Sequence, residues 1–277
     1  MANPVVPLPG LGGWRFLQRT LDRQQASFAR DPVNAREIQY LKDNIAKADT
    51  AEKLVADRTM LKVALGAFGL GEELPKRAFV RKALEGGVED KKAFANRLVD
   101  PKYREITAAF GYGDAKGAQV AQPGFAEDIA ARFRVRSFEE AVGAVNGDMR
   151  LALNFDREMA RLASAGLKED TAFLRILGDK ALGAVFQKAF GLPEAFGALE
   201  VDQQLSVLKE RSARLTGGEG FKAFASADVR DKALRQFFAR SQIEQGPSPT
   251  ARGAAALTLL QGGAGPNALF NLLQSRL

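Results

Sequence analysis

The sequence predicts an all-α fold made of two related helical-bundle subdomains, with an amphipathic helix at each end of the chain. Three observations support this. Apolar residues recur at helical spacing through almost the whole sequence. Aspartate precedes, and glycine follows, several of these apolar patterns, as expected at helix ends. One such pattern is also written twice, from Asp57 and again from Asp179, which indicates an internal duplication.

The N-terminal segment, residues 1–34, is expected to be a separate amphipathic element. A seven-residue repeat with two apolar positions carries Trp14, Leu17, Leu21 and Phe28, and it breaks at Asp31. This stripe has two explanations: it packs on its own domain, or it pairs with helices of other subunits. The glycine- and proline-rich stretch before it favours the second, because such a tether lets a segment dock elsewhere. We therefore expect removal of residues 1–30 to spare the central fold but to impair association and, in cells, motility.

The first subdomain, residues 35–122, contains the clearest helix. Its apolar stripe consists of Met60, Leu61, Ala64, Leu65 and Phe68. Asp57 is placed to cap the first turn. Gly69 is placed to end the helix in the left-handed conformation, which only glycine adopts without steric cost. The sequence therefore predicts a buried Phe68 followed by Gly69 at positive φ.

The second subdomain, residues 165–245, repeats this helix from Asp179 to Phe190 and Gly191. A looser copy within the first subdomain ends at Phe110 and Gly111. We interpret the two subdomains as diverged copies. Chance similarity between amphipathic helices remains the alternative, because alanine, phenylalanine, leucine and glycine are common in this chain.

The two remaining regions are a connector and a tail. Residues 123–164 are predicted to form a long helix, or a pair broken near Gly147, with Ser137 and Glu140 forming a capping box at a helix start. The stretch 132–136 alternates like a strand but is too short to build a sheet. Residues 246–277 read as a linker and short C-terminal helices, whose stripe of Leu269, Leu272 and Leu273 needs a surface on which to dock.

Composition argues against several classes of enzyme. The 277 residues include no cysteine and no histidine, so a zinc site of the usual ligands or a nucleophile activated by imidazole cannot be assembled. Its glycine-rich stretches do not match the phosphate-binding loop pattern. We therefore expect no enzyme, no cofactor and no metal, and the sequence identifies no small-molecule substrate. The net charge of +7 favours acidic partners without identifying one.

The most distinctive polar run, residues 146–158, contains the candidate ligand-binding residues Arg150, Asp156 and Arg157. These side chains could line a pocket between the subdomains, or they could form ion pairs within the chain. Basic clusters elsewhere, such as the one around Arg77 and Arg81, are surrounded by acidic residues. Nucleic-acid binding is therefore not expected, because it requires cations gathered on one face.

Two long stretches, residues 40–70 and 79–112, resemble the bacterial family called domain of unknown function 1217, and the resemblance covers roughly residues 35–215. Its most specific part is "RKALEGGVEDKKAFANRLVDPKYRE". Members are typically encoded among flagellar genes of alphaproteobacteria. The resemblance therefore implies a flagellum-associated protein, with flagellar proteins or further copies of itself as partners, and it supplies no catalytic residue.

Together these observations predict a non-enzymatic, flagellum-associated structural, assembly or regulatory protein that acts through helix-mediated protein–protein contacts. The alternative is a helical binding module for a small ligand or nucleic acid, held in the cleft between the subdomains. No basic segment followed by an apolar run opens the chain, and no run approaches the ~20 apolar residues that span a bilayer. We expect synthesis in the cytoplasm without a cleaved signal peptide, and no membrane span, with export or association with the flagellum left open.

Overall fold

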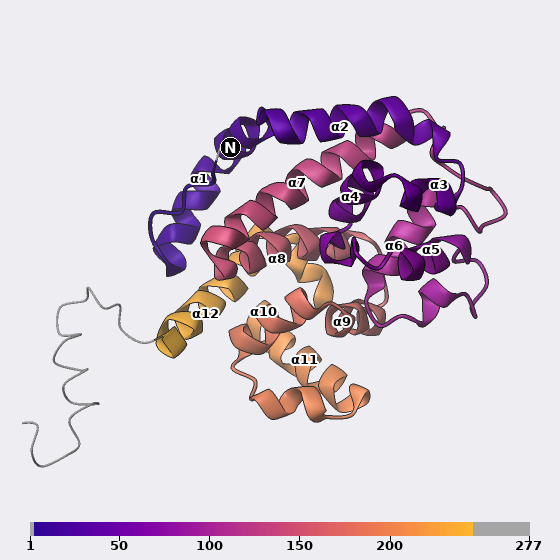
Figure 1. Cartoon of the computed structure of the whole chain (residues 1–277). Helices are drawn as coiled ribbons and strands as arrows, with labels where there is room; N and C mark the ends of the chain where they lie inside the picture. Colours follow the sequence, from indigo (N-terminus) through magenta and orange to yellow (C-terminus); the bar gives the residue numbers. More distant parts are fainter. Residues whose placement is uncertain (1–2, 246–277) are drawn as a thin grey trace, which may run out of the picture.

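Aspartates cap the start of several helices of this protein, and glycines end several of them. In the computed structural model, which describes residues 3–245, Oδ1 of Asp57 accepts a hydrogen bond of 2.9 Å from the backbone N–H of Met60. Asp179 does the same for Ala181 and Leu182. The predicted all-α class is confirmed: the described residues form α-helices and short 3₁₀ turns, with no strand among them (Figure 1).

In chain order the α-helices are α1 (Gly10–Ala29), α2 (Pro32–Asn44), α3 (Ala51–Ala56), α4 (Arg58–Ala67), α5 (Arg77–Glu85), α6 (Pro101–Phe110), α7 (Phe125–Val145), α8 (Gly147–Ser164), α9 (Glu169–Gly178), α10 (Lys180–Phe190), α11 (Val201–Thr216) and α12 (Ala227–Gln245). The 3₁₀ turns are η1 (Ile45–Lys47), η2 (Gly71–Glu73), η3 (Phe94–Arg97), η4 (Glu194–Ala198) and η5 (Phe221–Ala225). Among residues 3–245, no helix is both long and apolar enough to cross a lipid bilayer.

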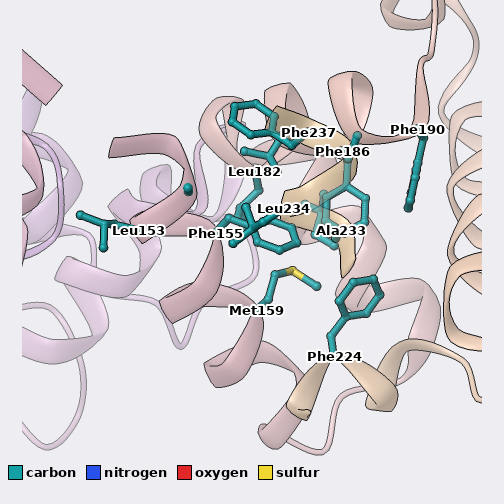
Figure 2. Close-up of a cluster of buried hydrophobic side chains, with 14 of the residues drawn as sticks. Leu153, Phe155, Met159, Leu182, Phe186, Phe190, Phe224, Ala233, Leu234 and Phe237 are labelled. Atoms are coloured by element: carbon teal, nitrogen blue, oxygen red, sulfur yellow. The ribbon is translucent and has the colours of Figure 1, made fainter. Parts of the chain in front are cut away.

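The buried side chains gather in two hydrophobic cores. The first core lies among α2 to α6 and the start of α7, around Leu61 and Phe110. The second core lies among α1, the end of α7 and α8 to α12. Figure 2 shows its centre, where Phe155 and Phe186 lie with ring centroids 5.5 Å apart. Each core defines one subdomain.

The helix α7 is a wall of both cores, so the subdomain boundaries differ from the expected ones. Ile129 and Phe133 belong to the first core, whereas Phe138 and Val142 belong to the second. Five residues separate Phe133 from Phe138, which turns the second ring about 140° around the helix axis. The region 123–164 is therefore no separate connector: α7 is shared, and α8 lies wholly in the second subdomain. The expected break at Gly147 is confirmed, because α8 begins there.

The N-terminal helix α1 is part of the second core rather than a separate element, which corrects the expectation for residues 1–34. Trp14 and Leu17 are 1% and 0% exposed, and α1 packs on α7, α8 and α12. Leu21 and Phe28 are half-buried against the same core, and Phe28 meets the ring of Phe138 edge-on at 5.6 Å. The repeat showed that one side of α1 is apolar, but it could not show which surface covers that side. The predicted C-terminal stripe of Leu269, Leu272 and Leu273 lies outside the described residues.

The repeated helix end is confirmed. The rings of Phe68, Phe110 and Phe190 are all buried, and the glycines that follow them, Gly69, Gly111 and Gly191, have φ of 72°, 66° and 60°. The same capping hydrogen bond closes α4 and α10: Leu70 N donates to Leu65 O, and Leu192 N donates to Gln187 O, each at 2.8 Å.

The two subdomains also share an order of elements. Apart from η1, which has no counterpart in the second subdomain, the run α2, α3, α4, η2, α5, η3, α6 in the first matches α8, α9, α10, η4, α11, η5, α12 in the second. In both, the first helix packs on the third. The last helices of the two runs differ in their packing. In the second subdomain α12 packs extensively along α10, but in the first subdomain the helix that packs along α4 is α7, not α6. The internal duplication stays a prediction, favoured by the shared order and by the shared caps.

Candidate functional site at the junction of the subdomains

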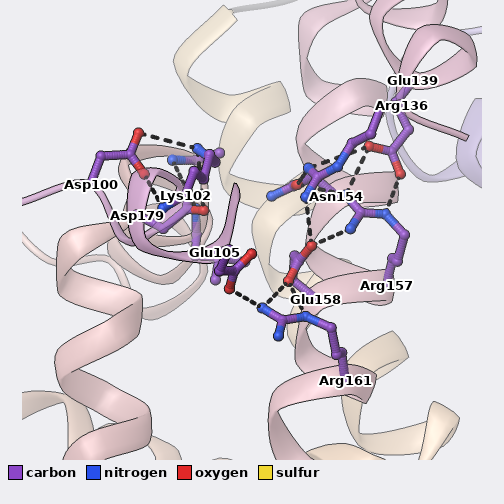
Figure 3. Close-up of polar contacts among 12 residues, drawn as sticks. Asp100, Lys102, Glu105, Arg136, Glu139, Asn154, Arg157, Glu158, Arg161 and Asp179 are labelled. Carbon is purple, nitrogen blue, oxygen red and sulfur yellow. Dashed lines mark hydrogen bonds and ion pairs between the residues drawn. The ribbon is translucent and has the colours of Figure 1, made fainter. Parts of the chain in front are cut away.

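A cluster of charged side chains fills the junction between the two subdomains (Figure 3). We call it the junction cluster; it consists of Glu105 from α6, Arg136 and Glu139 from α7, and Asn154, Arg157, Glu158 and Arg161 from α8. The four α8 residues follow one another at intervals of three, one and three, so they share one face of that helix. The same face meets Arg136 and Glu139, which are one turn apart on α7.

Arg157 is bound at both edges of its guanidinium. Its Nε and Nη2 donate to the two carboxylate oxygens of Glu139, at 2.7 and 2.9 Å. Nη2 also donates to Oδ1 of Asn154 at 2.9 Å, and the remaining nitrogen, Nη1, contacts Glu158. Two-point pairing of this kind fixes the orientation of both side chains. It joins α7 firmly to α8.

Glu158 receives three guanidinium groups and is 5% exposed. Arg136 donates to Oε1 at 2.7 Å, Arg161 donates to Oε2 at 2.8 Å, and Arg157 contacts Oε1. Burial alone would raise the pKa of this carboxyl, but the positive charges of Arg157, Arg136 and Arg161 outweigh that effect and lower the pKa to about 2. Glu158 is therefore ionised at every physiological pH and suits a structural role better than proton transfer.

Two ion pairs cross from the first subdomain to the second. Arg161 on α8 donates through Nη2 to Oε1 of Glu105 on α6 at 2.8 Å. Lys102, also on α6, places its Nζ 3.4 Å from Oδ2 of Asp179, the residue that caps α10. Because Asp179 is buried, this second pair anchors α6 to the start of a helix in the other subdomain.

The structure does not bring the three predicted ligand residues together. Arg157 lies in the junction cluster, whereas Asp156 pairs with Nε of Arg230 on α12 at 2.7 Å. Arg150 is exposed and belongs to neither group. The six residues from Arg150 to Asp156 turn about 240° around α8, which points the two side chains in different directions. Ion pairs within the chain, the alternative that the sequence left open, account for Asp156 and Arg157.

A surface groove beside the junction cluster was not predicted. We call it the arginine groove; it has a volume of about 340 Å³ and lies between η3 and α6 on one side and α8 and α9 on the other. Its principal lining residues are Asn96, Leu98, Val99, Arg104, Arg161, Leu174 and Arg175. Local sequence could not reveal it, because Arg104 and Arg175 belong to different subdomains and no short motif contains both.

The arginines of this groove differ in how they are paired. Arg104 donates through Nε to the amide oxygen of Asn96 at 3.1 Å, and Arg161 holds Glu105. Arg175 is half-buried, and burial lowers the pKa of its guanidinium. The positive charges of Arg104 and Arg161 add to that shift, whereas the negative charge of Glu105 opposes it.

Within residues 3–245, no group of three or more aspartates and glutamates is arranged to hold a metal ion.

Comparison with known proteins places the chain beside proteins without an assigned activity. Residues 67–234 match the model of a family described as "Protein of unknown function (DUF1217)". The crystal structure of protein AGR_C_984 from Agrobacterium tumefaciens is similar, with a TM-score of 0.70 and 25% identity. The similarity covers 88% of this chain and 100% of that one. No curated protein matches this sequence.

Proposed function

The chain belongs to the DUF1217 family, and we propose that it is a non-enzymatic, flagellum-associated structural, assembly or regulatory protein that acts by binding other proteins. The flagellar setting comes from the gene neighbourhood that the family resemblance implies. The family match begins at the end of α4 and runs into α12, so it includes α6, α7 and α8, the helices that meet at the junction.

The observation that carries the proposal is the way in which the junction cluster uses its charges. Arg157 is committed to Glu139 and Glu158, and Glu158 is held ionised by three arginines. This arrangement suits a structural role, because buried two-point ion pairs fix the relative position of the helices that carry them. A fixed junction presents the arginine groove beside it as a surface of constant shape. Preorganised surfaces lower the cost of binding a partner.

The proposal is tested in flagellated cells that make this protein. A tagged full-length chain should capture flagellar proteins in a pull-down, and deletion of its gene should impair swimming in a way that the wild-type gene restores. An untagged strain processed in parallel defines background capture. Normal swimming of the deletion strain, together with capture at background level, would show the proposal to be wrong.

A further inference from the structure

We propose that the arginine groove binds an acidic side chain of a partner protein, on a segment that also places an apolar side chain beside the carboxylate. The inference deepens the proposed function, since it rests on that function and names the chemistry of the partner. It stands on the charge, the hydrogen bonding and the exposed apolar rim of the groove.

The groove carries more positive charge than it can neutralise. Three arginines line it, and Glu105 is the single acidic residue among its described lining residues. That carboxylate is already bonded to Arg161. Among residues 3–245, neither Arg104 nor Arg175 forms an ion pair or a hydrogen bond with a carboxylate, so two guanidinium groups line the groove without a carboxylate bonded to them.

The half-buried guanidinium of Arg175 has lost hydration, and the charge of Glu105, which is itself paired with Arg161, only partly offsets that loss. Its five N–H donors form a planar fork that matches a carboxylate or a phosphate. A bound anion between Arg104 and Arg175 would recover this interaction. The lowered pKa of the Arg175 guanidinium agrees with the same picture, because burial and its cationic neighbours both act against its charge.

The rim of the groove selects among anions. Val99 is 85% exposed and Leu174 is 44% exposed, and both lie beside the arginines. Inorganic phosphate would leave these side chains in water. A nucleic acid would gain little, because the described lining has no aromatic ring on which a base could stack. A peptide with glutamate next to leucine or valine satisfies the charge and the apolar rim together.

Binding of a defined probe to the full-length protein tests the inference. The probe is a fluorescein-labelled, end-blocked peptide Leu-Glu-Val-Glu-Leu, and its matched counterpart has glutamine in place of both glutamates. Fluorescence anisotropy at low salt should show that the glutamate peptide binds at least about tenfold more tightly. Raising the salt concentration should weaken the binding, since the arginines are accessible to solvent.

Three variants test whether binding of the peptide depends on the groove rather than on the overall positive charge of the protein. The double variant Arg104→Gln with Arg175→Gln should weaken binding at least about tenfold. Arg134→Gln removes one positive charge from an exposed site on α7 that does not line the groove, and it should leave affinity within about twofold. Val99→Ser with Leu174→Ser should weaken binding severalfold, because it removes the apolar part of the site. Thermal melting should stay near that of the wild type for the arginine double variant, which breaks no ion pair within the chain.

Several results would overturn the inference. These are equal affinity for the glutamate and glutamine peptides, an unchanged affinity of the arginine double variant, or inorganic phosphate that displaces the peptide while the serine variant binds normally. The last result would identify a small-anion site. If the peptide fails to bind but the wild-type chain still captures flagellar proteins, only the groove inference fails. If the peptide binds through the arginines but no flagellar protein is captured and swimming is normal, only the proposed function fails.

Discussion

Arg161 and Glu105 form an ion pair that separates two grooves at the junction. The Nη2–Oε1 distance is 2.8 Å, and both residues line the arginine groove of about 340 Å³ and a second groove of about 320 Å³. The second groove runs past Phe68 and Arg132, whose guanidinium lies 5.2 Å from the centre of that ring. One pair thus connects the subdomains and forms a wall shared by two concave surfaces.

Removing Arg157 should destabilise the fold strongly. Arg157→Ala leaves the carboxylate of Glu139, which is 5% exposed, without its two-point partner. Breaking a buried pair from one side costs about 3–5 kcal/mol. Urea unfolding followed by circular dichroism measures this change.

The matched control is Arg214→Ala, which breaks an exposed ion pair with Glu210 one turn away on α11. Pairs of this kind contribute about 0.3–0.5 kcal/mol. Equal effects of Arg157→Ala and Arg214→Ala would contradict the role assigned to the junction cluster.

The stability of the protein should depend on the ionisation of Glu158 in acid. Its pKa falls from the usual 4.5 to about 2 in the folded protein. Because the folded-state pKa is the lower one, the stabilisation is complete above pH 4.5 and is lost as the pH falls from 4.5 towards 2. The shift corresponds to about 3 kcal/mol.

The variant Glu158→Gln isolates this contribution, since it cannot titrate. It should be less stable than the wild type at neutral pH, and the difference should shrink as the pH falls through this window. Free energies of unfolding from urea titrations at a series of pH values give both curves. A difference that stays constant from pH 5 to pH 2 would show that Glu158 does not titrate as described.

The glycines that end the helices should differ in their tolerance of alanine. At Gly69 an added Cβ would lie 3.4 Å or more from its neighbours, so the cost is that of the left-handed conformation, about 1–2 kcal/mol. At Gly111 the Cβ would lie 2.8 Å from the backbone oxygen of Gly117, which cannot move as a side chain can. Gly111→Ala should therefore lower the melting temperature more than Gly69→Ala, and the opposite order would contradict this account.

The position of Trp14 reverses the expectation that removal of residues 1–30 spares the central fold. Its ring lies 6.0 Å from that of Phe238 inside the second core. Trp14→Ala should cost about 3–5 kcal/mol, and deletion of residues 1–30 should destabilise the second subdomain. Leu8→Ala, at a site 57% exposed, should change stability by less than about 0.5 kcal/mol. Chemical unfolding of the three proteins decides the point.

Features controlled by neighbours along the chain could be predicted from the sequence. The cap at Asp57 and the stop at Gly69 depend on atoms within about five residues, and both are found where the pattern placed them. The capping box at Ser137 is the exception: Ser137 lies inside α7, not at its start. Its residues are also compatible with a helix interior, and packing of α7 on two cores carries the helix through that position.

Features that depend on distant partners could not be predicted. The spacing of apolar residues in α1 predicted that one side of this helix is apolar. It could not predict that α12, at the far end of the described chain, packs on that side. The arginine groove exists only because α6 and α9 meet, which brings Arg104 near Arg175. The polar residues around Arg157 in the sequence marked it as a candidate, but its partner Glu139 is on another helix. The ion pair that joins α7 to α8 is therefore seen only in the structure.

The packing of α1 on α12 has a consequence for the growing chain on the ribosome. Trp14 is among the first residues to be made, and Phe238, its neighbour in the second core, is made close to the end. At translation rates of ~5–20 residues per second, Trp14 waits about 10–45 s for this partner. The first core draws on residues up to about Phe133 and can assemble earlier. During that interval α7 and α8 can already pack on the first helix, but the part of its apolar side that α12 covers still lacks its partner.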